Sequence, residues 1–312
     1  MRKSRLIGGA LLAVAAIAGG LWSAVAQEAS STGIPVHVVV TVEPRHGSNV
    51  PVINREDVMV YQGHDRAKVT GWSPLQGERA GLQLFILTDD AASTSLGSQL
   101  EDIRQFINAQ PSTTAIGVAY MRNGTAEILE NPTNDHTHAA KALRLPLGDP
   151  GASASPYFCV VDLIKRWPEG PVRREILMIS DGIDRFGGGG PSNPYVDSAI
   201  EEAQRAGVIV YSIYTPGVGH YGHSFWRMNW GQNYLSQLSD ETGGESYYLG
   251  FGAPVSFAPY LDDLSHRLTR QYLLTFLAKP ERKAEFQPFK LRTEVPNAEL
   301  VAADRVYVPA GM

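Results

Sequence analysis

Apolar and polar positions divide the chain into a β-rich start, an alternating middle and a β-rich end. Residues 82–88 (LQLFILT) form a nearly continuous apolar run, which is typical of a strand buried on both faces of a parallel sheet. Residues 96–108 instead carry apolar side chains at helical spacing, at Leu96, Leu100, Ile103 and Ile107. Strand and helix patterns continue to alternate as far as residue 249. We therefore predict an α/β fold with a doubly wound, mainly parallel sheet.

The middle segment, residues 81–250, has six strand patterns, at residues 82–88, 115–120, 126–129, 175–179, 208–214 and 245–249. Helix patterns lie at residues 96–108, 157–166, 195–206 and 234–242, and another follows at 257–270. Glycines at positions 207 and 243 directly follow two of these helices, where a left-handed residue commonly ends a helix.

The flanking segments, residues 33–80 and 251–312, are rich in short strand patterns. These patterns cover residues 36–41, 58–61, 69–72, 271–278, 289–291, 299–302 and 305–308. The N-terminal segment has too little apolar sequence for a core of its own. We expect the two chain ends to join in one small β module beside the α/β segment.

The N-terminus has the pattern of a secretory signal peptide over residues 1–26. Arg2, Lys3 and Arg5 precede an apolar run at residues 6–22, and Ala24-Val25-Ala26 provides the small residues of a cleavage site. The alternative is an uncleaved membrane anchor. No later run approaches the ~18 apolar residues of a membrane span. We expect an exported protein, periplasmic or secreted, with no membrane span once the signal is removed.

Charge, cysteine count and motifs argue against several classes of function. The formal charge of −5 over 312 residues argues against nucleic-acid binding, which needs a basic surface. The single cysteine, Cys159, excludes an intramolecular disulfide and a cysteine-rich zinc module. Neither a GxSxG elbow nor an SxxK motif is present in the sequence. We therefore expect a binding protein and not an enzyme.

Carboxylates and hydroxyls follow two of the predicted strands. The strand at 82–88 leads into Asp89, Asp90 and Ser93, and the strand at 175–179 leads into Ser180 and Asp181. Sheets of this kind bind ligands at the carboxyl ends of their strands. Converging oxygen ligands favour a hard divalent cation, Mg²⁺ or Ca²⁺.

The order of these motifs resembles a von Willebrand factor type A (VWFA) domain, and in particular the secreted bacterial proteins in which flanking β segments surround it. The resemblance covers most of the chain after residue 26. The family's motif is Asp-x-Ser-x-Ser after the first strand, a Thr on a middle loop and an Asp-Gly turn after a central strand. Together these form a metal-ion-dependent adhesion site, whose shell an acidic group of a partner protein completes. The resemblance implies Asp89, Ser93, Ser155 and Asp181 as metal ligands.

The sequence departs from that motif at its first serine. With Asp89 as the first Asp, Ala91 replaces this serine and Ser93 fills the second position. In the alternative register, which begins at Asp90, Ala92 and Thr94 take these places. Either way one hydroxyl ligand is missing, so either water fills the gap or the site no longer holds metal. For the hydroxyl ligand on the middle loop there are likewise two candidates, Ser153 and Ser155.

Residues 215–231 are rich in aromatic side chains and follow the strand at 208–214. Tyr221, Trp226 and Trp230 are candidates for a partner-binding surface, because exposed aromatics on loops often anchor protein interfaces. The alternative is that they pack this loop onto the domain. Two hypotheses follow: an adhesion-type protein-binding domain that uses a divalent cation, or a structural or interaction module with no working metal site.

Overall fold

The fold is described by a computed structural model that covers residues 33–149, 155–187 and 190–311. Its central feature is a six-stranded sheet with the order β6-β5-β4-β7-β8-β9. All neighbouring strands are parallel except β6, which is antiparallel to β5. The strands are β4 (Leu82–Asp89), β5 (Thr114–Arg122), β6 (Thr125–Thr133), β7 (Arg173–Ser180), β8 (Val208–Tyr214) and β9 (Ser246–Tyr247). The chain is therefore an α/β protein with a mainly parallel sheet.

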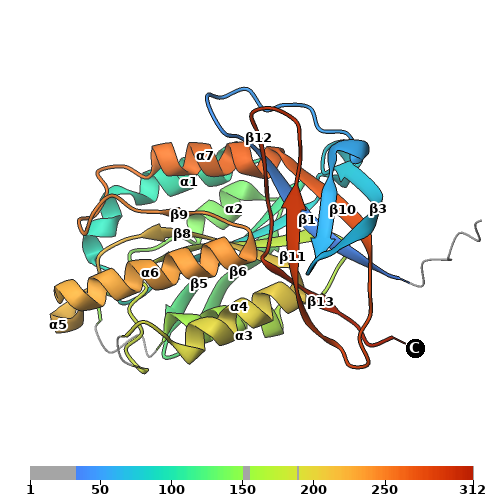
Figure 1. Cartoon of the computed structure of the whole chain (residues 1–312). Coiled ribbons are helices and arrows are strands. Elements are labelled where there is room, and N and C mark those ends of the chain that lie inside the picture. The colour runs from blue at the N-terminus through green and yellow to red at the C-terminus, as the bar shows by residue number, and fades with distance from the viewer. Residues whose placement is uncertain (1–32, 150–154, 188–189, 312) are drawn as a thin grey trace, which may run out of the picture. The chain divides into compact units, whose positions relative to one another are not determined.

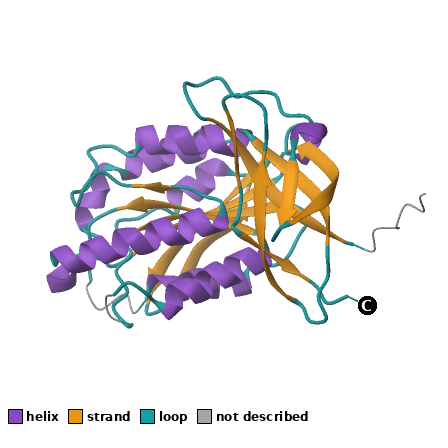
Figure 2. Ribbon diagram, viewed as in Figure 1, coloured by secondary structure: helices purple, strands orange, loops and turns teal. Residues whose placement is uncertain are grey.

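Helices cover both faces of this sheet, as Figures 1 and 2 show. One face packs against α1 (Leu100–Ala109), α2 (His136–Lys141) and α7 (Ala258–Thr269). The other packs against α3 (Pro156–Arg166), α4 (Pro194–Ala206) and α6 (Phe225–Thr242). Each face of the sheet forms a hydrophobic core with its helices, and β4 contributes to both because side chains alternate along a strand. Leu84 and Ile86 face the first set of helices, and Phe85 and Leu87 face the second.

The strands on either side of this α/β segment form a second, antiparallel sheet with the order β12-β1-β10-β3-β2-β11-β13. These strands are β1 (Ile34–Pro44), β2 (Met59–Gln62), β3 (Asp65–Pro74), β10 (Gln271–Ala278), β11 (Glu285–Arg292), β12 (Ala298–Val301) and β13 (Arg305–Val308). β1 and β10 pair over eight residues, from Ile34 opposite Ala278 to Thr41 opposite Gln271. Long-range pairing between the two flanks thus holds the second sheet together.

The second sheet lies against the amino-terminal ends of the parallel strands. One pocket of about 390 Å³ is lined by both sheets: by Val38 and Leu273 on β1 and β10, and by Arg173 and Val208 where β7 and β8 begin. The opposite, carboxyl-terminal ends of β4, β7 and β8 lead into the loops that carry the candidate site.

Two helices differ from the sequence prediction. The helix expected at residues 96–108 is split into a 3₁₀ turn, Thr94–Ser98, and α1. α6 begins at Phe225, nine residues before the expected start at Tyr234, and the short α5 (Gly219–Gly222) precedes it. Much of the segment expected to be an aromatic loop is therefore helical. Further 3₁₀ turns lie at Arg55–Asp57 and Gly77–Arg79.

The signal-peptide prediction concerns residues 1–26, which lie outside the described residues. In the part of the chain that is described, no helix is both long and apolar enough to cross a bilayer.

Candidate functional site

The carboxyl ends of β4 and β7 bring the two predicted aspartates to one place. The two strands are neighbours and pair in parallel from Leu82 opposite Arg173 to Thr88 opposite Ile179. Asp89 ends β4, and Asp181 follows the last residue of β7. Both carboxylates are buried, with 0% and 1% of their surfaces exposed.

The Asp89 carboxylate accepts hydrogen bonds from a backbone N–H group and from a serine hydroxyl group. The backbone N–H of Ala91 donates to Asp89 Oδ1 at 2.8 Å, and the Ser180 hydroxyl donates to Oδ2 at 2.7 Å. Ser180 Oγ in turn accepts the N–H of Gly182 at 3.0 Å. These bonds tie the loop after β4 to the turn after β7.

Asp181 forms an ion pair with Arg185, four residues further on. Arg185 Nη2 lies 2.6 Å from Asp181 Oδ2, and Nη1 lies 3.2 Å from Oδ1, so the guanidinium bonds to both carboxylate oxygens. Oδ1 also accepts the Ile183 N–H at 2.9 Å. The pair is enclosed, since only 5% of the Arg185 side chain and 1% of the Asp181 side chain are exposed.

The loops after β4 and β8 cover this pair. The N–H of Val218 donates to the carbonyl of Ala91 at 2.9 Å, and the N–H of Ser93 donates to the carbonyl of Pro216 at 2.9 Å. Between these bonds lies Gly217, whose backbone rests directly on the ion pair. A Cβ at Gly217 would lie 1.9 Å from Asp181 Oδ2, so no larger residue fits there without movement.

Burial has a clear electrostatic consequence for Asp89. It raises the pKa of this carboxyl group from its usual value near 4 to about 6, and the negative charge of Asp181 acts in the same direction. The positive charge of Arg185 and the hydrogen bonds from Ala91 and Ser180 oppose this rise.

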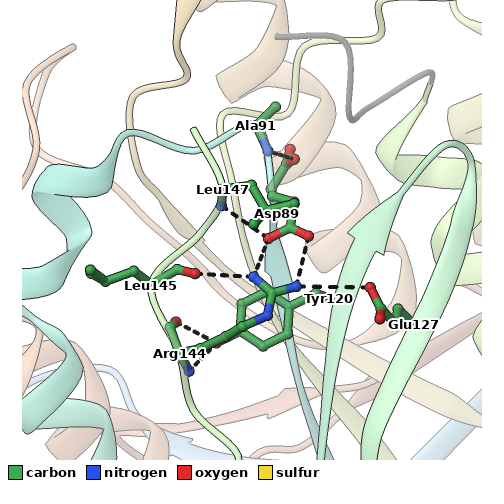
Figure 3. Close-up of polar contacts among 8 residues, drawn as sticks. Asp89, Ala91, Tyr120, Glu127, Arg144, Leu145 and Leu147 are labelled. Carbon is green, nitrogen blue, oxygen red and sulfur yellow. Dashed lines mark hydrogen bonds and ion pairs between the residues drawn. The ribbon is translucent and has the colours of Figure 1, made fainter. Parts of the chain in front are cut away.

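A second arginine neutralises Asp90, the other aspartate of the motif. Arg144 bonds to both Asp90 carboxylate oxygens, at 2.6 and 2.8 Å. Its guanidinium stacks on the Tyr120 ring, 3.8 Å from the centroid, and Glu127 lies 3.8 Å away (Figure 3). The Leu147 N–H also donates to Asp90 Oδ1, at 3.2 Å. Asp90 is thus held by groups on another loop.

The two predicted hydroxyl ligands are placed differently. Ser93 caps the 3₁₀ turn at Thr94–Ser98, and its Oγ accepts from the backbone and the hydroxyl of Ser95 at 3.2 and 2.9 Å. Ser155 precedes α3 and is fully buried, and its Oγ has no hydrogen-bond partner among the described residues. The alternative ligand, Ser153, lies outside the described residues.

These residues, as the structure places them, do not fit a divalent cation. Each of the four carboxylate oxygens of Asp89 and Asp181 already accepts a hydrogen bond from the chain itself. The Arg185 guanidinium pairs with the Asp181 carboxylate, and the buried methyl group of Ala91 provides no lone pair. Within residues 33–149, 155–187 and 190–311, no group of three or more acidic, histidine or cysteine side chains is arranged to hold a metal.

The aromatic candidates separate into exposed and packed residues. Trp226 is 72% exposed in the first turn of α6. Trp230 is partly buried, stacks on Tyr234 at 6.3 Å between ring centroids, and packs at the edge of the core. Tyr221 lies in α5, and its side chain is outside the described part of the structure.

An aromatic patch surrounds Trp226. Phe225, 56% exposed, contacts both Trp226 and Phe251, with centroid separations of 5.6 and 5.2 Å. The Gln232 side-chain amide donates to the Gly250 carbonyl at 2.6 Å and so holds the loop after β9 against α6. We call the residues Phe225, Trp226 and Phe251 the aromatic patch.

Sequence reasoning missed Arg185 and Arg144. The sequence shows Arg185 as the basic residue that ends the stretch Asp181-Gly-Ile-Asp-Arg, but it does not show that Arg185 turns back to pair with Asp181. Nothing in the sequence indicated Arg144, because it reaches Asp90 from a loop 54 residues away.

Similarity to known proteins is found among solved structures and not among sequences. No family model and no curated protein matches this sequence. Among solved structures, an aerotolerance-related membrane protein from Bacteroides fragilis is 14% identical, with a TM-score of 0.42, and the match covers 60% of this chain and 98% of that one. BatB from Bacteroides thetaiotaomicron is 12% identical, with a TM-score of 0.43, over 61% and 98% of the two chains. The VWA domain of SpRpn10 is 13% identical, with a TM-score of 0.37, over 58% and 94%.

Proposed function

We propose that this protein is a protein-binding domain of the VWFA kind that docks its partner at the carboxyl ends of the parallel strands without a divalent cation. The observation that carries the proposal is the aromatic patch. Phe225 and Trp226 are 56% and 72% exposed, and Phe225 lies against both Trp226 and Phe251. Contiguous exposed apolar side chains mark interaction surfaces, and aromatic residues contribute most to their affinity.

The closed ion pair favours this mode of binding over a cation-bridged one. An adhesion site needs a metal that the partner's carboxylate can reach, whereas Asp181 and Arg185 lie beneath Gly217 and are almost fully buried. A carboxylate on a partner therefore gains no access to Asp181. The patch instead suits a protein that presents apolar side chains.

We further propose that the protein acts outside the cytoplasm and is not an enzyme. The apolar run at residues 6–22 and the Ala24-Val25-Ala26 site support export. Intact mass measurement of the protein recovered from the periplasm or medium tests this point. We expect a chain that begins at Gln27, and a chain that keeps Met1 would contradict export with cleavage.

The proposed surface can be tested by affinity capture from an extract of the host's envelope, followed by mass spectrometry. The bait is the wild-type protein or the double variant Phe225→Ser/Trp226→Ser, in a chelating buffer. We expect the wild type to retain a defined protein and the double variant to retain at least tenfold less, since interface aromatics contribute about 2 kcal/mol or more each.

Val52→Ser is the matched control for that experiment. Val52 is 79% exposed but lies between β1 and β2, far along the chain from the aromatic patch, so its replacement removes an exposed apolar side chain elsewhere. We expect this variant to capture the same protein as the wild type. Capture that requires Mg²⁺ or Ca²⁺, or that survives loss of Phe225 and Trp226, would contradict the proposal.

A further inference from the structure

Buried acidic groups gather where β4 and β7 end. Asp89, Asp181 and Asp184 are each no more than 1% exposed. Burying carboxylates without counter-charge is unfavourable, because the interior solvates charge poorly. Such a cluster needs a source of positive charge or a set of donors for each member.

The carboxylates of Asp184 and Asp181 are satisfied in different ways, one by neutral hydrogen-bond donors and the other by a positively charged side chain. Asp184 is satisfied by neutral donors, the N–H groups of Phe186 and Gly187 and the side-chain amide of Asn193, at 2.8 to 3.0 Å. Asp181, by contrast, receives both terminal guanidinium nitrogens of Arg185.

Asp89 belongs to the same cluster through Ser180. Ser180 directly precedes Asp181 in the chain, and its hydroxyl donates to Asp89 Oδ2 at 2.7 Å. The site that holds the guanidinium is thus built from the carboxylates of two neighbouring strands, which a single divalent cation would otherwise bridge.

Arg185 also connects the loops around the cluster. Nη1 donates to the Ile183 carbonyl at 3.3 Å, which fixes the turn after β7. A Cβ at Gly217 would lie 2.7 Å from Nη2, so the loop after β8 rests on the guanidinium itself. The loops after β7 and β8 therefore meet at this side chain.

We propose that the Arg185 guanidinium is the built-in cation of this site. It takes the place beside Asp89 and Asp181 that a divalent cation would need, and it keeps the loops after β4, β7 and β8 in one arrangement whatever the metal concentration. Removing its charge converts the cluster into a site that binds divalent cations. This inference concerns the interior of the site and does not depend on whether the aromatic patch binds a partner.

The test is thermal unfolding of the wild type and Arg185→Met, each with chelator and with millimolar Mn²⁺ or Mg²⁺. The wild type is expected to melt at the same temperature in all conditions. Arg185→Met is expected to melt lower in chelator and to recover about 5 °C or more with the cation, which then binds Asp89 and Asp181. An equal melting temperature of Arg185→Met with and without cation would overturn the proposal, as would a cation-dependent shift in the wild type.

Arg174→Met is the matched control for the loss of a buried arginine. Arg174 is 8% exposed and bonds to the carbonyls of Trp167 and Ala206, and its nearest acidic influence, Glu169, is exposed to solvent, so its removal leaves no buried carboxylate in need of a counter-charge. We expect it to lower the melting temperature without any response to cation. A cation response in Arg174→Met equal to that of Arg185→Met would overturn the assignment.

A second variant keeps the test decisive if Arg185→Met does not fold in chelator. Asp181→Asn/Arg185→Met removes both members of the ion pair and so relieves the unpaired charge. We expect this double variant to be folded in chelator and unresponsive to Mn²⁺. A double variant that responds to Mn²⁺ as Arg185→Met does would show that Asp181 is not a ligand and would overturn the proposal.

Discussion

At the scale of single residues, the most constrained group is Asp89. Its carboxyl group is fully buried, and burial together with the charge of Asp181 raises its pKa to about 6. An aspartate in an unfolded chain has a pKa near 3.9. Between these two values the folded protein binds more protons than the unfolded chain, so the contribution of Asp89 to stability is present at low pH and is lost as the pH rises through about 6.

Asp89→Asn is therefore expected to remove part of the pH dependence of stability. Asn cannot ionise, so the wild type should lose ~2 kcal/mol of unfolding free energy relative to Asp89→Asn between pH 4 and pH 8. Urea unfolding of both proteins across this range measures the difference. Parallel stability curves for the two proteins would contradict the raised pKa.

Residue-level prediction from the sequence reached the aspartates but not their partner. Asp89 and Asp181 could be placed together because each follows a buried strand, and the carboxyl ends of parallel strands share one edge of the sheet. The pairing of Arg185 with Asp181 could not be predicted, because the chain between them forms a turn and not a helix, in which residues four apart are neighbours. That turn depends on Gly182, which has φ of +65° and packs under the backbone of α6.

At the scale of elements, the packing of α6 against the turn after β7 positions the site. A Cβ at Gly231, within α6, would lie 2.2 Å from the Asp181 carbonyl oxygen. A Cβ at Gly182 would lie 2.3 Å from the Gly231 carbonyl oxygen. The helix and the turn thus approach with no room for a side chain between them.

Gly231→Ala is expected to push α6 away from that turn and to destabilise the protein by about 2 kcal/mol or more, since overpacking against backbone cannot relax by rotamer changes. Gly252→Ala is the matched control, because nothing lies within 4 Å of a Cβ there. Denaturant unfolding compares the two variants. Equal stabilities would contradict the close approach.

Strands were easier to predict than the start of α6. The patterns at residues 208–214, 271–278 and 305–308 coincide with β8, β10 and β13. The start of α6 was missed because Gly231 and the surrounding aromatics suggested a loop. Gly231 is required there by close packing, and Phe225 and Trp226 occupy the exposed first turn of the helix.

At the scale of the whole molecule, the residues from 33 onward form one compact unit built on two sheets. β1 pairs with β10 across more than two hundred residues of sequence, from Ile34 opposite Ala278 onward. Strand patterns show which segments are extended, but they do not specify such partners, because register depends on the cores that form on folding. Residues of the second sheet and of the amino-terminal ends of the parallel strands line one pocket, and the aromatic patch lies where α6 begins.

The measurement that tests the account most directly is a calorimetric titration of the wild-type protein with Mn²⁺ after chelation. Because Arg185 already pairs with Asp181 beneath Gly217, we expect no saturable heat and no change in melting temperature at millimolar Mn²⁺. A cation present at ~100-fold over its Kd would otherwise stabilise the fold by about 2.7 kcal/mol. Saturable Mn²⁺ binding that Asp181→Asn abolishes would contradict the account and would restore a metal-dependent adhesion site.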